Sequence, residues 1–467
     1  MEELPNELLL IILRGLVRYK LYEVLLPLVC RRWCALGKLL HKNTAYLKKR
    51  EKEPYTHLSR GTLMIAEAAE LGWFSVVKWL REVGCPWDEE LCAGAAKGGH
   101  LDILMWAREN RCYWISTTCL NAAEGGHLDI LKWASEKGCP WNYTIYSVAG
   151  TQGNMEMLRW AKENRKSFNV LACRGAAAGG HLDVLKWMRD EGFPWDDGTC
   201  ACAAKGGHLD VLKWARENGC SWNFSTTANA AREGHLEVIE WAVQNGCHWS
   251  AFCCQRAAES GHLGVLKWAS SNNLLHTQGL CYHAAQGGQV EVLEWAIENG
   301  AEWGEKSWMR AASGGHVNVL KWASEKQGWS IPLGKVCVDA AKEGHVEVLL
   351  WARTKGWEWD KATCANAAKC GQVNVLEAAR VSGCPWHEIN TEICLHASQT
   401  GHIETLIWAR ENDCSWSEEI CFEAAKEGHL WVLKWAVAHG CSWNATKCLE
   451  VASSKSVTQW ITSKMGE

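Results

Sequence analysis

The sequence AAKGGHLDVLKWARENGCSW, residues 203–222, decides the fold, because close variants of it recur along most of the chain. Each copy holds a Gly-His pair, and positions are counted here from its histidine, the anchor. The anchors are His100, His127, His181, His208, His235, His262, His316, His345, His402 and His429. Asn154, Gln289 and Gln372 replace the anchor in three copies, and Trp73 and Ser456 continue the frame at its two ends. About fifteen units, mostly 27 residues apart, predict a solenoid in which each unit packs on its neighbours.

Composition excludes several classes of protein. The chain has 467 residues, of which 48% are hydrophobic, enough for a continuous core. Its formal net charge of −4 argues against a general nucleic-acid binder, which would normally be basic. Met1 is followed by Glu2 and Glu3, so we expect no secretory signal. There is no run of 18 apolar residues, so no membrane span is expected. We therefore expect the protein in the cytoplasm or nucleus.

One unit shows how the pattern predicts helices. Asp88 is a good N-cap for a first helix over residues 89–97, which would end at the glycine pair 98–99. A second helix would start near His100, with Asp102 in its first turn, where a carboxylate favours the helix dipole. The fold class is therefore all-α, a solenoid of helical hairpins.

Most of the 24 cysteines occupy two positions of the repeat. Eleven lie eight residues before the anchor, and eight lie in the corner Gly-Cys-Pro/Ser-Trp or a close variant of it. The first position holds Ile65, Tyr146, Thr227 and Trp308 in other units, which neither bridge nor bind metal. A cysteine that exchanges with such residues behaves as a small hydrophobe. We expect reduced thiols, with no metal and no cofactor.

The histidines and tryptophans have structural and functional interpretations. The anchor histidine exchanges with Asn and Gln, which share its ability to hydrogen-bond backbone at a helix start; this favours a structural role over a metal-binding or catalytic one. Tryptophan recurs in the second helix of fourteen of the fifteen units and again after the following turn. We favour packing between neighbouring hairpins over a platform for stacked bases.

The run AAxxGHLxVLKWAxxxG resembles the ankyrin repeat, AAxxGHxxVVxLLLxxGA, over about 400 residues. The resemblance implies two antiparallel helices per unit. Two departures matter: Thr-Cys or similar stands in place of the ankyrin TPLH turn, as at Thr118-Cys119, and the period is 27. We expect the projecting β-hairpin of ankyrins to shrink to a tight loop.

Residues 1–43 do not fit the repeat. Residues 4–13 are apolar almost all round; such a helix must be buried, and a segment this short needs a partner to bury it. The segment resembles the F-box, LPxELLxxILxxL followed by an LVCRRW-like helix. The matching residues are Leu4, Pro5, Leu8, Ile12, Leu13, Leu28, Val29, Arg32 and Trp33. The resemblance implies that these residues bind the Skp-type adaptor of a cullin–RING ubiquitin ligase. The alternative is a capping helix pair for the solenoid.

The expected domains are the F-box-like segment 1–43, a linker 44–61 and the solenoid 62–467. An F-box before short, Trp- and Cys-rich ankyrin-like units also resembles families of large DNA viruses of protists, which would place the protein in host cytoplasm.

A target-binding face is predicted from variation between units. Positions −6 and −3 lie one turn apart on one face of the first helix, and their residues share neither size nor charge. In the middle units this face becomes basic. The candidate target-binding residues are Asn229, Arg232, Arg256, His283 and Arg310. The alternative is surface drift without selection.

Catalytic patterns are weak: no phosphate-binding loop, paired carboxylates, HExxH or CxxC cluster stands out. The sequence therefore predicts a monomeric, non-enzymatic substrate receptor of an SCF-type ligase that captures a protein target and binds no nucleic acid or membrane. The alternatives are a scaffold or host-protein-binding protein without a ligase role, and a nucleic-acid-binding solenoid.

Overall fold

The computed structural model describes residues 65–82, 85, 87–164, 167–326, 330–384 and 386–466. The predicted F-box-like segment 1–43 and linker 44–61, with the first residues of the segment 62–467, lie outside the described residues. Every regular element in the described part is a helix, and no strand occurs there. This confirms the all-α fold class and the tight loops in place of β-hairpins. Contacts divide the chain between Thr226 and Thr227 into two compact units, which are treated separately below.

Most helices are one short arm of a hairpin. Those of the first compact unit are α6 (Phe74–Glu82), α7 (Glu89–Gly98), α8 (Leu101–Glu109), α9 (Ser116–Glu124), α10 (Leu128–Glu136), α11 (Ile145–Thr151), α12 (Met155–Glu163), α13 (Leu171–Gly179), α14 (Leu182–Asp190), α15 (Asp197–Lys205) and α16 (Leu209–Glu217). Helix α17 (Phe224–Glu233) spans the division.

The second compact unit continues the same alternation. Its helices are α18 (Leu236–Gln244), α19 (Ala251–Ser260), α20 (Leu263–Ser271), α21 (Leu280–Gln286), α22 (Val290–Glu298), α23 (Glu305–Ser313), α24 (Val317–Ser324), α25 (Leu333–Glu343), α26 (Val346–Thr354), α27 (Lys361–Lys369), α28 (Val373–Val381), α29 (Trp386–Thr400), α30 (Ile403–Glu411), α31 (Glu418–Lys426), α32 (Leu430–Ala438), α33 (Ala445–Val451) and α34 (Lys455–Met465).

Helix boundaries follow the local signals of the sequence. Helix α7 begins after Asp88, whose Oδ1 accepts a hydrogen bond from Glu90 N at 3.1 Å, and it ends at Gly99, which is left-handed at φ 85°. The second helix, α8, begins directly after the anchor His100. The predicted first helix therefore matches α7 to within one residue at either end, and the predicted start of the second helix matches that of α8 to within one residue.

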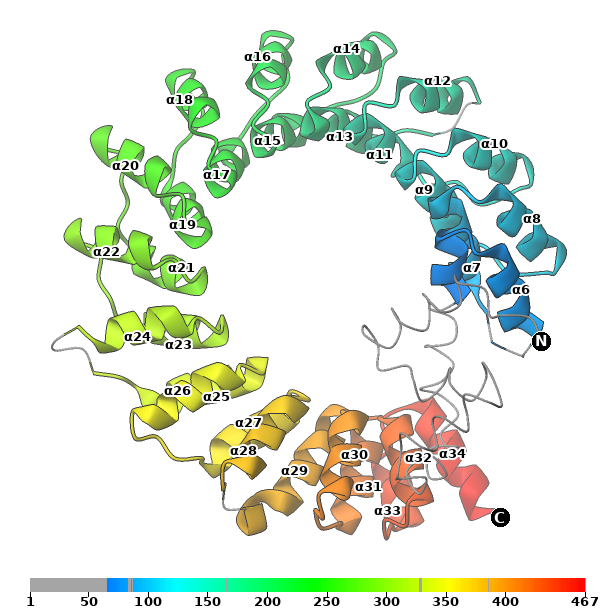
Figure 1. Ribbon diagram of the computed structural model, residues 1–467, viewed down its shortest axis with the longest axis vertical. Helices are drawn as coiled ribbons and strands as arrows, with labels where there is room; N and C mark the ends of the chain where they lie inside the picture. Colours follow the sequence, from blue (N-terminus) through cyan, green and yellow to red (C-terminus); the bar gives the residue numbers. More distant parts are fainter. Residues whose placement is uncertain are drawn as a thin grey trace, which may run out of the picture. The chain divides into compact units, whose positions relative to one another are not determined.

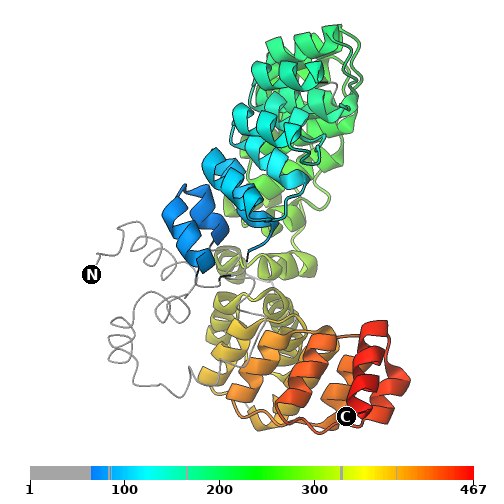
Figure 2. The same ribbon diagram turned by 90° about the vertical axis from the view of Figure 1, so that its right-hand side faces the viewer.

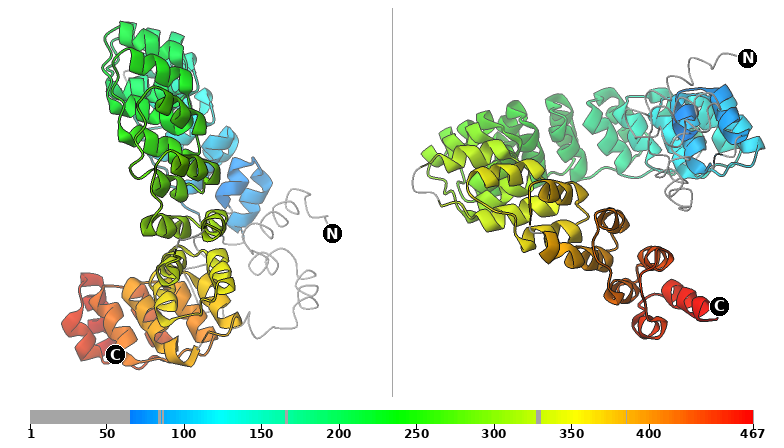
Figure 3. Two further views of the ribbon diagram at one scale, coloured as in Figure 1. Left: turned by 90° about the vertical axis from the view of Figure 1, so that its left-hand side faces the viewer. Right: turned by 60° about the horizontal axis from the view of Figure 1, so that its bottom comes forward.

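The hairpins place odd-numbered first helices in one row and even-numbered second helices in another (Figure 1). Figure 2 and Figure 3 show from other directions that consecutive hairpins within a compact unit stack side by side. First helices of neighbouring hairpins contact one another far more extensively than second helices do. Small residues allow this, since a Cβ on Gly94 would lie 2.4 Å from Ala66 O. Within each compact unit the first helices therefore form the inner, concave row.

The anchor side chains join each hairpin to the one before it. His316 Nε2 lies 2.8 Å from Gln286 O, and His345 Nε2 lies 2.8 Å from Ser313 O. The same contact, at 2.9 to 3.2 Å, is made by His127, His181, His208, His429 and Gln372. The accepting carbonyls lie in the last turn of the preceding first helix, where no intrahelical donor remains for them.

This contact corrects one detail of the sequence-based expectation. The histidine was expected to bond backbone at the start of its own helix, but these histidines make no side-chain cap. Asn154 does so instead, accepting from Met157 N at 3.0 Å. The longer imidazole and Gln side chains reach the neighbouring hairpin. The structural role predicted for the anchor is confirmed, with a different partner.

A glycine in the preceding hairpin makes room for the anchor in most hairpins; Gly126, before the Asn154 hairpin, is an exception. Gly288 has φ +75°, and a Cβ there would lie 2.5 Å from Nδ1 of His316. Gly180 with His208 and Gly344 with Gln372 repeat the arrangement. We call the combination of left-handed glycine, anchor side chain and helix-end carbonyl the Gly-anchor interlock.

We predict that Gly288→Ala is more destabilising than Gly300→Ala. Both positions are left-handed, at φ +75° and +84°, so alanine should cost about 1–2 kcal/mol at each. Only at Gly288 would the methyl group displace His316, because nothing lies within 4 Å of a Cβ on Gly300. Losing the His316 bond should add about 1 kcal/mol. Urea unfolding of the two variants measures the difference; equal free energies of unfolding would contradict the interlock.

Candidate functional site

The predicted target-binding residues lie on first helices of the concave row, at positions −6 and −3. Asn229 and Arg232 are on α17, Arg256 is on α19, His283 is on α21 and Arg310 is on α23. The three residues Arg256, His283 and Arg310 occupy position −6 of consecutive hairpins. We call them the basic cluster. All three belong to the second compact unit.

Arg256 is held by two neighbours on its own helix. Its Nη1 lies 3.1 Å from Glu259 Oε2, an ion pair at i,i+3 spacing. Its guanidinium carbon lies 4.7 Å from the ring centroid of Phe252, within the range of a cation–π contact. The arginine is thereby restrained, while 34% of its side chain stays exposed.

His283 lies between the two arginines and is only loosely partnered. Its Nδ1 is 3.9 Å from Glu259 Oε2, too long for a hydrogen bond. This nitrogen is buried and has no hydrogen-bond partner. Burial lowers the pKa of the His283 imidazole; Glu259 opposes that shift, and Arg256 and Arg310 add to it. The ring is therefore neutral near pH 7 and able to gain a proton beside an added anion.

Arg310 is exposed but positioned by the preceding hairpin. Its Nε donates a hydrogen bond to the Tyr282 hydroxyl. Its guanidinium carbon lies 4.9 Å from the Tyr282 ring centroid. Because Nε makes this hydrogen bond, the two terminal nitrogens of the Arg310 guanidinium take no part in it.

The structure links Arg256, His283 and Arg310 into one cluster, through Glu259 and Tyr282. Arg232 is exposed and, among the described residues, takes no part in the contacts that join these three; Asn229 is half-buried. Reasoning from sequence missed Glu259, Phe252 and Tyr282. The sequence shows a carboxylate at the variable position −3, Glu259. It does not show that this carboxylate lies beside both Arg256 and His283.

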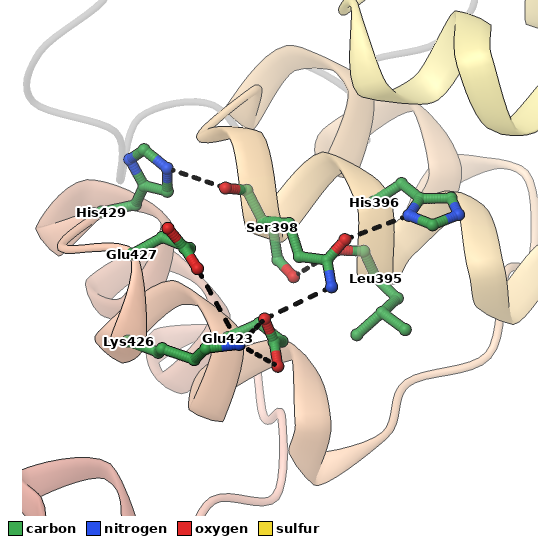
Figure 4. A network of polar contacts seen from close by, with 8 residues as sticks. Leu395, His396, Ser398, Glu423, Lys426, Glu427 and His429 are labelled. Atoms are coloured by element: carbon green, nitrogen blue, oxygen red, sulfur yellow. Dashed lines mark hydrogen bonds and ion pairs between the residues drawn. The ribbon is translucent and has the colours of Figure 1, made fainter. Parts of the chain in front are cut away.

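Charges at these positions reverse sign further along the second compact unit. Asp339, at position −6 of α25, pairs with Lys342 at 3.2 Å. On α31, Glu423 accepts from Lys426 at 3.2 Å and from Gln399 of α29 at 3.3 Å. Figure 4 shows Glu423 beside Lys426. The basic cluster is therefore bounded, because the next hairpin presents a carboxylate in the same position.

The tryptophans form a packed series between hairpins. Trp114 is 7% exposed and contacts Trp133 edge to face, with centroids 5.8 Å apart. The guanidinium carbon of Arg108, from the preceding second helix, lies 4.1 Å from the Trp114 ring centroid. Trp195 repeats both contacts with Trp214 and Arg189. This confirms the predicted packing role, since the indole faces are already occupied.

The cysteines form buried contacts of thiols with one another and with backbone. The sulfur atoms of Cys364 and Cys384 are 3.7 Å apart, and Cys220 donates to Asp196 O at 3.1 Å. Burial raises the pKa of Cys173 to about 12 and that of Cys281 to about 11, so these thiols stay protonated. Thr227, which lies eight residues before its anchor as Cys173 and Cys281 do, donates a hydrogen bond to His248 O at 2.7 Å. The thiols therefore serve as weak donors as well as small apolar groups.

All cysteines in the described residues are free thiols. No group of three or more His, Cys, Asp or Glu side chains there could hold a metal ion. Within the same ranges, no helix has the length and apolarity needed to cross a membrane. The predicted adaptor-binding residues, Leu4 to Trp33, lie outside the described residues.

Comparisons with known proteins bear on the fold alone. No family model matches the chain, and no curated protein matches it. The human ASB11 ankyrin repeat domain is 20% identical, with a TM-score of 0.30, over 38% of this chain and 96% of that one. Pentatricopeptide repeat protein PPR10 from maize is 13% identical, with a TM-score of 0.31, over 99% of this chain and 80% of that one. PPR10 is also seen in complex with an 18-nt psaJ RNA element, at a TM-score of 0.25. The class of protein is a helical-hairpin solenoid.

We predict that the fold needs neither zinc nor disulfides. Excess chelator and excess reductant should each leave the helical circular dichroism and the urea midpoint unchanged, because the buried thiols already satisfy one another. Elemental analysis of the purified protein is the control. Stoichiometric zinc, or loss of helicity in either reagent, would contradict the structural interpretation of the cysteines and histidines.

Proposed function

We propose that the chain is a non-catalytic protein-interaction scaffold whose concave first-helix row holds a protein target. One observation carries the proposal. The interlock glycines, the anchors and the buried alanines recur from hairpin to hairpin, while positions −6 and −3 change in size and charge on the same, partly exposed face. Arginine and aromatic side chains, the types enriched at binding hot spots, gather at α19, α21 and α23.

The finer part of the proposal is a role as substrate receptor of an SCF-type ubiquitin ligase. Its support is the F-box-like pattern of residues 1–43, which would bind a Skp-type adaptor and bring a cullin ligase to the target held by the repeats. We propose a location in the cytoplasm or nucleus; the resemblance of the F-box and repeats together to families of large DNA viruses of protists would make this the cytoplasm of a host cell. A scaffold without a ligase role is the alternative, distinguished by the presence or absence of adaptor and cullin after affinity purification.

We predict that Leu8→Asp or Ile12→Asp abolishes adaptor binding. Each change would place a charge in an apolar interface, at a cost of several kcal/mol. Titration of purified full-length protein with a Skp-type adaptor measures the effect, and Lys52→Gln in the predicted linker is the control that should bind normally. If the wild-type chain binds no adaptor, or the Asp variants bind equally well, residues 1–43 are not an F-box.

We predict that Arg256→Gln with Arg310→Gln abolishes target capture and leaves adaptor binding intact. Gln removes both charges without placing a new carboxylate beside Glu259. The effect on stability should be within about 1 kcal/mol, because partly exposed ion pairs contribute little. Partners are compared by mass spectrometry after purification from the native cell.

The matched control is Lys267→Gln with Lys321→Gln. These two exposed lysines lie on α20 and α24, the second helices of the α19 and α23 hairpins. The control loses the same charge from the opposite row, so it should keep every partner. Retention of all partners by the arginine variant would place the target elsewhere, whereas its unfolding would make those arginines structural.

A further inference from the structure

The basic cluster repeats at the spacing of the solenoid. Arg256, His283 and Arg310 hold the same position in three consecutive hairpins, whose first helices pack against one another. Packed helices lie about 8–10 Å apart, so the three basic side chains should start from points separated by about that distance. A ligand that engages all three must therefore present anionic groups at the same interval, along one side.

Polyproline II is the regular peptide conformation with this period. It has three residues per turn and rises about 3.1 Å per residue, so every third side chain lies on one side at intervals of about 9 Å. A β-strand places same-side residues only about 7 Å apart, and one turn of an α-helix advances about 5.4 Å. The helical repeat of the solenoid thus matches the repeat of a polyproline II segment.

The aromatic side chains of the cluster suit the same ligand. Phe252 and Tyr282 lie beside Arg256 and Arg310 and stack with them, and the Tyr282 and His283 rings contact edge to face at 5.0 Å. Proline-rich segments dock on aromatic side chains, and their preformed conformation lowers the entropy cost of binding. The aromatic rings would contact the residues between the anionic ones.

Carboxylates limit the basic cluster on one side and occupy part of it when no ligand is bound. Asp339 occupies the same position in the next hairpin, α25, so the run of basic residues at this position ends at Arg310. Glu259 is the carboxylate that Arg256 and His283 share in the free protein. A carboxylate of the ligand would therefore have to compete with Glu259 for Arg256 and His283.

We propose that Arg256, His283 and Arg310 bind a polyproline II segment of a protein target that carries an acidic side chain at every third residue. The inference rests on the proposed function, since it specifies what the concave row recognises. Arg256 and Arg310 each offer guanidinium nitrogens to a carboxylate. His283 lies between the two arginines in the series of hairpins, and a proton taken up by its imidazole, whose Nδ1 has no hydrogen-bond partner, would add positive charge beside the central carboxylate.

The test is a titration of the full-length protein with two synthetic peptides of equal composition and charge. One repeats Glu-Pro-Pro three times; the other has its three glutamates adjacent, between flanking prolines. We expect the spaced peptide to bind at least about tenfold more tightly, the equivalent of one good charge-assisted contact. Equal affinities, or no binding of the spaced peptide, would overturn the inference.

Variants separate this inference from the proposed function. Arg256→Gln with Arg310→Gln should abolish peptide binding, and Lys267→Gln with Lys321→Gln should not change it. Glu259→Gln should tighten it severalfold by removing the competing carboxylate, a gain that a merely structural cluster would not give. If the arginine variant loses its cellular target but wild-type protein ignores the spaced peptide, the proposed function stands and the polyproline inference fails.

The pH dependence gives a second readout. The groups facing His283 are Glu259 and Arg256 of α19 and Arg310 of α23. Burial and the two arginines keep the imidazole neutral near pH 7, and a bound carboxylate favours its protonated form. Affinity for the spaced peptide should therefore rise as the pH falls from 8 to 6, while the peptide glutamates stay ionised. His283→Gln should flatten the profile; an unchanged slope in that variant would remove His283 from the site.

Discussion

The Gly-anchor interlock is the contact on which the rest of this structure depends. A carbonyl at the end of one first helix would otherwise lack a donor, and the anchor of the next hairpin supplies it, for example from His316 to Gln286. The imidazole reaches that carbonyl because the intervening glycine is left-handed and has no Cβ. One short contact therefore fixes the distance between hairpins and satisfies a helix end at the same time.

The interlock also explains why position −3 is free to vary. The accepting carbonyl belongs to the residue at position −3 of the preceding hairpin, but only its backbone takes part. Its side chain is Lys97, Thr151, Ala178, Gln286 or Ser313 in different hairpins, with the same contact each time. The framework therefore places a side chain on the concave row without specifying it. Variation at this position and regularity of the fold have the same physical origin.

The sequence predicted the elements better than the contacts between them. Periodicity and glycine pairs predicted α7 and α8 to within a residue, because helix ends depend on local signals such as Asp88 and Gly99. The partner of the anchor could not be read in this way, since His316 bonds a residue 30 positions earlier, in a neighbouring hairpin. N-caps were predictable only in part: Asp360 and Asn444 accept from backbone, whereas Ser250 and Ser417 do not. Of the candidate site, sequence gave the basic residues but not Glu259 or Tyr282, because linkage across hairpins depends on side-chain conformation.

The contacts that restrain the two arginines of the basic cluster would lower the entropy cost of binding a ligand there. A flexible arginine loses conformational entropy when it binds, at a cost of about 1.5–2 kcal/mol. Arg256 is already held by Phe252 and Glu259, and Arg310 by Tyr282, so part of that cost is met when the solenoid folds. The restraining groups are an aromatic ring, a hydroxyl and one carboxylate, which leave terminal guanidinium nitrogens available. Had two carboxylates held each arginine, as a purely structural network would, an incoming anion would have no net attraction to the site. One carboxylate, Glu259, contacts the basic cluster, beside Arg256 and His283. The proposed binding of an acidic target depends on this excess of basic over acidic side chains.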